Sequence, residues 1–145
     1  MKIFPAVSAL VLVAALAPSA ASAATEHFVV ISGGKKVGHL EADTQGGKTA
    51  IVFDIKNNGR GPTIAETLTL ANGLPVAWDI TGATTFGSKV AEHYAATAAG
   101  AEWTDSTGSG HAAAPGLYIG QQASPWALGV YARALLAHGG TMAAL

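Results

Sequence analysis

The chain has 145 residues, half of them hydrophobic and only 12% charged, and its formal net charge at pH 7 is −1. A net charge this close to zero gives no overall basic field that would indicate nucleic-acid binding. It contains no cysteine, which excludes disulfides, cysteine-based zinc sites and a thiol nucleophile.

Residues 1–23 have the pattern of a secretory signal peptide. Lys2 supplies a short positive region, residues 3–16 form an apolar run, and Ala21-Ser22-Ala23 is a small-residue cleavage site. The apolar run is shorter than the roughly 20 residues that a membrane-spanning helix needs, and there is no cysteine to carry a lipid. We therefore expect cleavage after Ala23, a periplasmic or secreted location, and no membrane association of the processed protein.

Residues 24–104 are predicted to form an antiparallel β-meander. Apolar and polar side chains alternate in residues 51–56, 63–70 and 76–81, and alternation with period two gives a strand one buried and one wetter face. Glycine-containing turns separate these segments, and Asn72-Gly73 is a strong hairpin signal because both residues tolerate positive φ. Similar segments on either side bring the total to six or seven strands. The predicted fold class is therefore mainly β, with one curved antiparallel meander sheet or an open barrel.

The pattern changes after residue 104. Residues 105–123 have no periodicity and are rich in small residues, which predicts a flexible loop. Ser124-Pro125 favours the start of a helix, residues 124–138, that ends before Gly139-Gly140. Arg133 is the only charge between its cap and His138, so this single C-terminal α-helix must be covered. It would pack on the sheet or on a partner domain that the chain lacks.

The sequence contains no motif for metal or phosphate binding. Metal motifs cluster their ligands, whereas no histidine lies within four residues of another, which favours scattered surface histidines. Gly33-Gly34-Lys35-Lys36 lacks the spacing of a phosphate loop, and Arg60 sits at a turn tip where water would solvate it. Ser109 between two glycines is predicted to lie in the loop, not on the strand-to-helix turn of a serine hydrolase. The histidines are His27, His39, His93, His111 and His138.

Two glutamates are less ordinary because each alternates with apolar residues. Glu66 shares a predicted face with Ile64, and Glu92 shares one with Val90, and burial raises the pKa of a carboxyl group. Paired carboxylates can perform acid–base chemistry, but one strand would separate these two, so their backbones would lie roughly 10 Å apart. The favoured interpretation is that each accepts hydrogen bonds from a hydroxyl, an amide or Lys89.

The aromatic side chains leave two interpretations open. They form the hydrophobic core, or they line a cavity for an apolar ligand. The residues concerned are Phe53, Trp78, Phe86, Tyr94, Trp103 and Trp126.

Several stretches resemble a known family. Residues 54–66 (DIKNNGRGPTIAE), Gly73-Leu74-Pro75, Ile80-Thr81-Gly82 and residues 123–129 (ASPWALG) together resemble the N-terminal β-rich region of exported bacterial metal-dependent amidohydrolases. The resemblance covers roughly residues 26–136. It rests on a run of unusual turns rather than on a catalytic motif.

In that family, the β-rich region precedes a barrel that hydrolyses C–N bonds. A divalent metal, held by a His-x-His motif, further histidines, an aspartate and often a modified lysine, activates the water. None of these motifs occurs in the chain, so the resemblance implies no catalytic, cofactor-binding or metal-binding residue here. It implies a non-catalytic N-terminal accessory domain or fragment of a periplasmic amidohydrolase, whose partner is the barrel or another apolar surface. The abrupt end at Leu145 also suggests a chain that stops partway through a larger one.

Two other hypotheses remain. The first is a free-standing periplasmic binding or chaperone-like protein that holds an apolar ligand on a curved β-sheet. The second is a small enzyme that uses Glu66 and Glu92.

Overall fold

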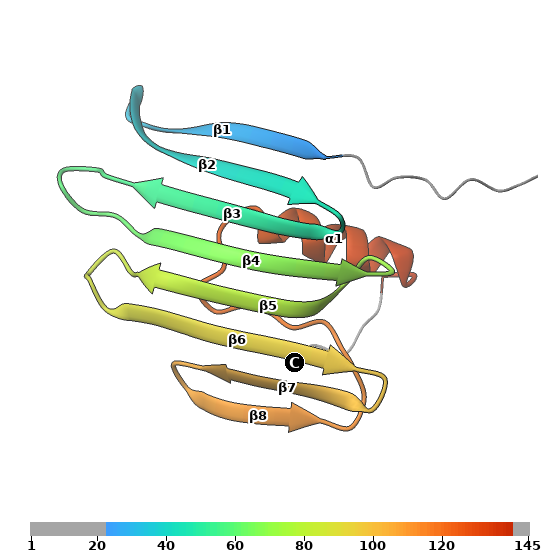
Figure 1. The fold of residues 1–145 in the computed structure, drawn as a ribbon. Helices are drawn as coiled ribbons and strands as arrows, with labels where there is room; N and C mark the ends of the chain where they lie inside the picture. The colour runs from blue at the N-terminus through green and yellow to red at the C-terminus, as the bar shows by residue number, and fades with distance from the viewer. Residues whose placement is uncertain (1–22, 141–145) are drawn as a thin grey trace, which may run out of the picture.

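We describe the protein from a computed structural model, which covers residues 23–140. Apart from Ala23, the predicted signal peptide lies outside the described residues. Eight strands and one helix follow one another along the chain (Figure 1). They are β1 (Ala24–Ser32), β2 (Lys35–Gln45), β3 (Lys48–Ile55), β4 (Thr63–Ala71), β5 (Leu74–Ala83), β6 (Lys89–Thr97), β7 (Gly100–Asp105), β8 (Gly108–Ala112) and α1 (Ala127–Ala137).

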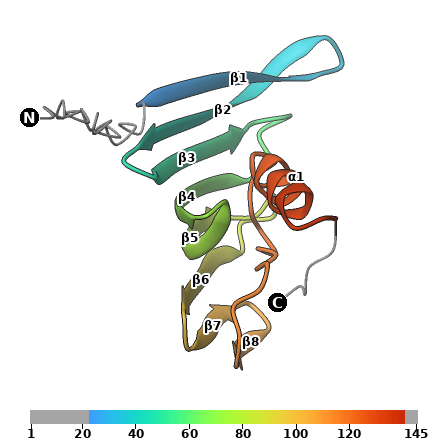
Figure 2. The ribbon, with the colours of Figure 1, turned by 90° about the vertical axis from the view of Figure 1, so that its right-hand side faces the viewer.

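The eight strands form one antiparallel sheet in which every strand pairs with its neighbour in the chain, in the order β1 to β8. The predicted class, mainly β with one C-terminal helix, is therefore confirmed. The structure differs in two respects: it has eight strands rather than six or seven, and the sheet is open and uncurled (Figure 2), with β1 and β8 as its free edges.

The eighth strand lies inside the segment that the sequence predicted to be a flexible loop, so that prediction was wrong for residues 108–112. The side chain of Asp105 closes the β7–β8 turn, because it accepts hydrogen bonds from both the backbone N–H and the hydroxyl of Thr107. Gly110 faces Trp103 so closely that a Cβ atom there would lie 2.3 Å from the indole ring. Glycine is thus required by packing and does not mark a loop.

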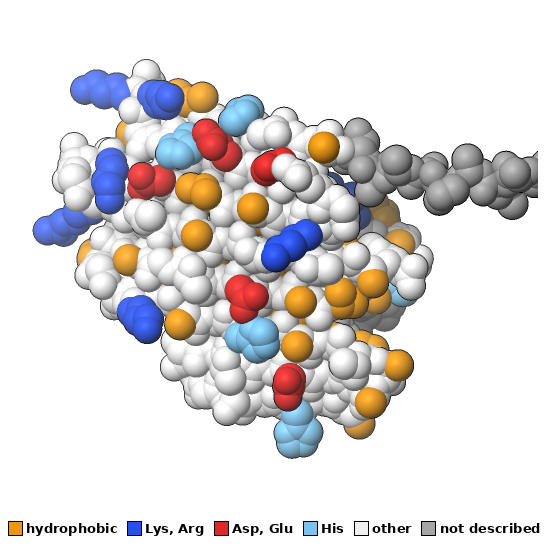
Figure 3. All heavy atoms as spheres, viewed as in Figure 1, with side chains coloured by type: hydrophobic (Ala, Val, Ile, Leu, Met, Phe, Trp, Pro, Cys, Tyr) orange, Lys and Arg blue, Asp and Glu red, His pale blue; other side chains and the backbone are white. Residues whose placement is uncertain are grey.

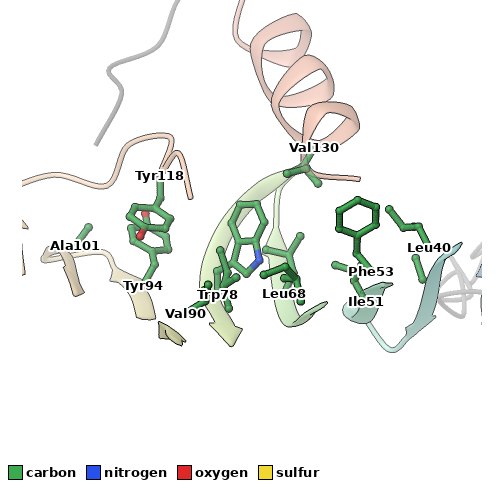
Figure 4. Packing of buried hydrophobic residues seen from close by; sticks show 14 residues of the cluster. Leu40, Ile51, Phe53, Leu68, Trp78, Val90, Tyr94, Ala101, Tyr118 and Val130 are labelled. Atoms are coloured by element: carbon green, nitrogen blue, oxygen red, sulfur yellow. The ribbon is translucent and has the colours of Figure 1, made fainter. Parts of the chain in front are cut away.

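Residues 113–126, which we call the crossing segment, run from β8 back along one face of the sheet to α1 (Figure 2). Together with α1 they cover one face of the sheet, the inner face, and leave the outer face to solvent. The inner-face side chains form a continuous hydrophobic core that includes Leu40, Phe53, Leu68, Trp78, Tyr94, Tyr118 and Val130 (Figure 4). One covered face is the usual arrangement for an antiparallel sheet.

Helix α1 begins three residues later than the sequence suggested. The carbonyls of Ser124, Pro125 and Trp126 accept hydrogen bonds from the N–H groups three residues ahead, which makes a tight first turn before regular helix begins at Ala127. Gly140 donates to the carbonyl of Leu135 and closes the C-terminus, as in a glycine-based helix end.

The helix has two apolar sides. Ala127, Val130 and Ala134 are buried against the sheet, whereas Leu128 and Leu136 face outward with 67% and 80% of their surfaces exposed. The sheet therefore covers only part of the apolar surface of α1.

We predict opposite effects for two glycine substitutions. Gly82 has a φ of 138°, and a Cβ atom there would lie 2.0 Å from the Thr63 carbonyl oxygen. Gly82→Ala should therefore lower the free energy of unfolding by about 2 kcal/mol or more. In α1, a Cβ atom on Gly129 would meet only the end of the flexible Arg133 side chain. Gly129→Ala should therefore raise the free energy of unfolding by about 1 kcal/mol. Urea unfolding measures both changes, and equal effects of the two variants would contradict the prediction.

Candidate functional site

Glu66 and Glu92 both lie on the inner face, as the sequence predicted. Each is only 4% exposed. Glu66 on β4 pairs with Ile80 on β5, and Ile80 pairs with Glu92 on β6, so the two glutamates share one cross-strand row with a strand between them. Neighbouring strands are about 4.8 Å apart, which places their backbones roughly 10 Å apart and confirms the predicted separation.

Glu92 binds the middle of the crossing segment. Its Oε1 accepts a hydrogen bond from the backbone N–H of Gln122 at 2.7 Å. Its Oε2 accepts one from the N–H of Gln121 at 2.9 Å and one from the Tyr118 hydroxyl at 3.2 Å. One buried carboxylate thus accepts hydrogen bonds from two consecutive peptide N–H groups, which belong to irregular backbone and not to a strand or helix.

Glu66 binds the end of the crossing segment, just before the helix. Its Oε1 accepts from the backbone N–H of Ser124, and its Oε2 accepts from the Trp78 indole N–H at 2.9 Å. Burial raises the pKa of the Glu66 carboxyl above its ordinary value, and the negative charge of Glu92 adds to this effect. Hydrogen bonds from Ser124 and Trp78 partly oppose it, because they favour the ionised form.

Aromatic rings fill the space around the two carboxylates. Tyr118 of the crossing segment stacks on Tyr94 with 4.7 Å between ring centroids and meets Trp78 edge-on at 6.4 Å. The Tyr131 hydroxyl on α1 accepts a hydrogen bond from the N–H of Gly120 at 3.0 Å. Burial raises the pKa of Tyr131 to about 12 and raises the pKa of Tyr118 further, so both phenols stay protonated and can donate.

This arrangement fits a structural role better than acid–base catalysis. All four carboxylate oxygens of the pair accept hydrogen bonds from the protein itself. The hydrogen-bonded interpretation is therefore confirmed, with amides and a hydroxyl as the main donors, whereas Lys89 is not a partner in these bonds. This geometry does not support the hypothesis of a small enzyme that uses Glu66 and Glu92, because a catalytic carboxylate must reach a substrate.

The histidines of the sheet lie on the outer face, and each stands directly opposite a carboxylate on the next strand. The pairs are His27 with Glu41, His39 with Asp54, Asp79 with His93, and Glu102 with His111. Figure 3 shows histidine and acidic side chains side by side on this face. The His93 Nδ1 to Asp79 Oδ1 distance is 2.7 Å and the His27 Nδ1 to Glu41 Oε1 distance is 3.4 Å.

These pairs do not build a metal centre. Over residues 23–140, no three His, Cys, Asp or Glu side chains come together in a way that could hold a metal ion. The sequence located the histidines on the surface correctly but missed their pairing, because the pairing depends on strand register. Ser109 lies on β8, opposite Thr104, and not in a loop.

The aromatic side chains mostly belong to the core. Trp78 and Tyr94 are fully buried, whereas Phe86 is exposed. Phe53 and Trp126 contribute to a small apolar groove beside β1, which we call the β1 groove. Its volume is about 230 Å³, and it is lined by Phe28, Val30, Leu40, Phe53, Pro125 and Trp126. This is less than the roughly 300–1,000 Å³ of typical small-molecule sites.

No known family model, no curated protein and no solved structure matches the chain. In the part of the chain that the structure covers, no helix is long and apolar enough to cross a bilayer.

The raised pKa of Glu66 predicts a pH dependence of stability. The folded protein keeps this proton at pH values where the unfolded chain has lost it, so the contribution of Glu66 to the free energy of unfolding should be fully present below the ordinary pKa of 4.5 and be lost as pH rises through the raised value. In Glu66→Gln this fall should be smaller, because the position no longer titrates. Urea unfolding at a series of pH values measures the slope.

The exposed Glu41 provides the control for this prediction. Glu41→Gln should leave the slope close to that of the unmodified protein, because Glu41 lies exposed on the outer face. Parallel curves for Glu66→Gln and the unmodified protein would show that Glu66 does not carry the effect.

Loss of the Glu92 carboxylate should release the crossing segment. Glu92→Ala leaves two peptide N–H groups and the Tyr118 hydroxyl without their acceptor, which should lower stability by about 3 kcal/mol. Amide hydrogen exchange at Gln121 and Gln122 should accelerate. The exposed Glu102 on β7 is the matched control, and Glu102→Ala should leave both amides protected; equal protection in Glu92→Ala would refute the anchoring role.

Proposed function

We propose that the chain is a non-catalytic accessory domain of an exported amidohydrolase, and that the outward side of α1 docks on the catalytic barrel. The observation that carries this proposal is the second apolar side of the helix. Leu128, Ala132 and Leu136 follow one another at intervals of four residues, so they form one stripe along the helix, and both leucines are largely exposed. A stripe of this kind is typical of a surface that another domain covers.

The inner face gives a second line of support. The protein's own crossing segment and helix cover the centre of this face, and the two buried carboxylates are fully engaged in holding that cover. This organisation favours a domain that supports or positions a neighbour. The resemblance of residues 54–66 and 123–129 to amidohydrolase N-terminal regions is our reason for proposing that barrel as the neighbour.

The β1 groove favours a second candidate, a periplasmic binding protein for an apolar ligand. Its six lining residues are all apolar. Its volume of about 230 Å³ would admit one short acyl chain or side chain but not a drug-sized ligand. We therefore rank this candidate second.

The proposal is tested by the size and sequence of the polypeptide that carries this chain in the source cells. Antibodies raised against residues 23–140 should precipitate a polypeptide several tens of kDa larger than this 14.5 kDa chain, and mass spectrometry should find in it a His-x-His metal motif. The isolated chain should show no amide hydrolysis with or without added divalent metal, because it carries none of the metal-binding motifs of the family.

Two results would oppose the accessory-domain proposal. A precipitated polypeptide no longer than this chain, with no amidohydrolase bound to it, would remove the proposed partner. Native mass spectrometry of the purified chain that showed a stoichiometric apolar molecule would support the binding protein instead. Phe53→Ala should then abolish the added mass, since Phe53 lines the groove.

A further inference from the structure

The two edges of the sheet differ in the way they meet solvent. Edge strand β8 has only five residues, Gly-Ser-Gly-His-Ala, which offer little apolar surface. Edge strand β1 has nine residues, with the run His27-Phe28-Val29-Val30-Ile31 at its centre. Among the described residues, β1 pairs with β2 along one edge, and no strand pairs with its other edge.

The apolar side chains of β1 are exposed on both faces of the sheet. Phe28 points to the inner face, where it pairs with Leu40, and about half of its surface is exposed. Val29 points to the outer face, is 57% exposed, and pairs with His39. Long, apolar, unprotected edges are rare in soluble proteins because they pair with strands of other chains.

We propose that β1 pairs with β1 of a second copy of this chain, antiparallel across a two-fold axis, to form a continuous sixteen-stranded sheet. The axis passes through Val29, so that Val29 meets Val29 of the second copy and Phe28 meets Val30. A two-fold axis perpendicular to the sheet keeps the inner faces of both copies on the same side. The interface is therefore isologous and closes at two copies.

This register is favoured because it merges the β1 grooves of the two copies. Phe28 and Val30 line the groove, and each would face the other residue across the axis. The two partly exposed grooves would thus become one apolar layer, flanked at each end by Trp126. Cross-strand pairs of large apolar residues are the units that stabilise antiparallel sheets.

Charge complementarity favours the same register. Glu26 and the lysines of the β1–β2 hairpin lie at opposite ends of β1, and Lys35 pairs with Ser32. Antiparallel pairing places Glu26 of one copy opposite Ser32 of the other, in the same cross-strand row as the second copy's Lys35, two strands away and on the same face. The backbone separation is about 10 Å, which a glutamate and a lysine side chain can span together. A register shifted by two residues would place Glu26 against Val30 in the apolar layer.

The solution mass of the purified chain, measured by light scattering over a range of concentrations, is the first test. We expect a dimer that dissociates on dilution. Val29→Lys should weaken association about tenfold or more, because two lysines would meet at the axis. The control is Val52→Lys, on the same outer face but on the interior strand β3, where Val52 is 43% exposed; it should leave the dimer intact.

Two further variants address the register and guard against a folding defect. The chain has no cysteine, so Val29→Cys should form a disulfide-linked dimer on mild oxidation, while Val52→Cys should not. Glu26→Lys should weaken the dimer, and Lys35→Glu added to it should restore association. A chain that stays monomeric at on the order of 100 μM, a dimer unaffected by Val29→Lys, or longer oligomers from β1–β8 pairing would each overturn the proposal.

Discussion

The hydrogen bonds from the crossing segment to Glu66 and Glu92 are the constraint on which the architecture depends. An open antiparallel sheet must bury one face, and the only helix in the described chain has eleven residues, too few to cover eight strands. The crossing segment supplies the missing cover over β5 to β7, but an irregular segment brings unpaired peptide N–H groups into the core. The two carboxylates accept those N–H groups, so irregular backbone can serve as a layer of the protein.

The same constraint explains what the sequence could and could not predict. The alternation in residues 51–56, 63–70 and 76–81 predicted the sheet and the inward direction of Glu66, and the spacing of Glu92 from Val90 predicted that of Glu92, since period two fixes the face of every residue once the core is known. The partners of the glutamates were not predictable, because Ser124 is 58 residues from Glu66 and Tyr118 is 26 from Glu92. Strand β8 was missed because its glycines and small side chains show no apolar–polar alternation. Only the close packing of Gly110 against Trp103 explains why a glycine stands within this strand.

The outer face shows how register produces a surface property that no local motif carries. Four histidines stand opposite four carboxylates because eight strands pair without crossovers. Exposed pairs of this kind contribute roughly 0–1 kcal/mol each, so their effect on stability is modest. Their larger effect is to add polar side chains to this face, whereas the outward side of α1 and the β1 edge carry runs of exposed apolar side chains.

Partners can occupy both apolar surfaces at the same time, because the surfaces lie on different parts of the molecule. Pairing through β1 uses the edge and the β1 groove, whereas the Leu128–Leu136 stripe lies on the side of α1 that faces away from the sheet. Because the two-fold axis is perpendicular to the sheet, both helices of a dimer would lie on the same side of the sixteen-stranded sheet, with both stripes facing away from it. In the proposed accessory role, such a dimer would therefore hold its two partner domains side by side on one face and leave the histidine-rich face free.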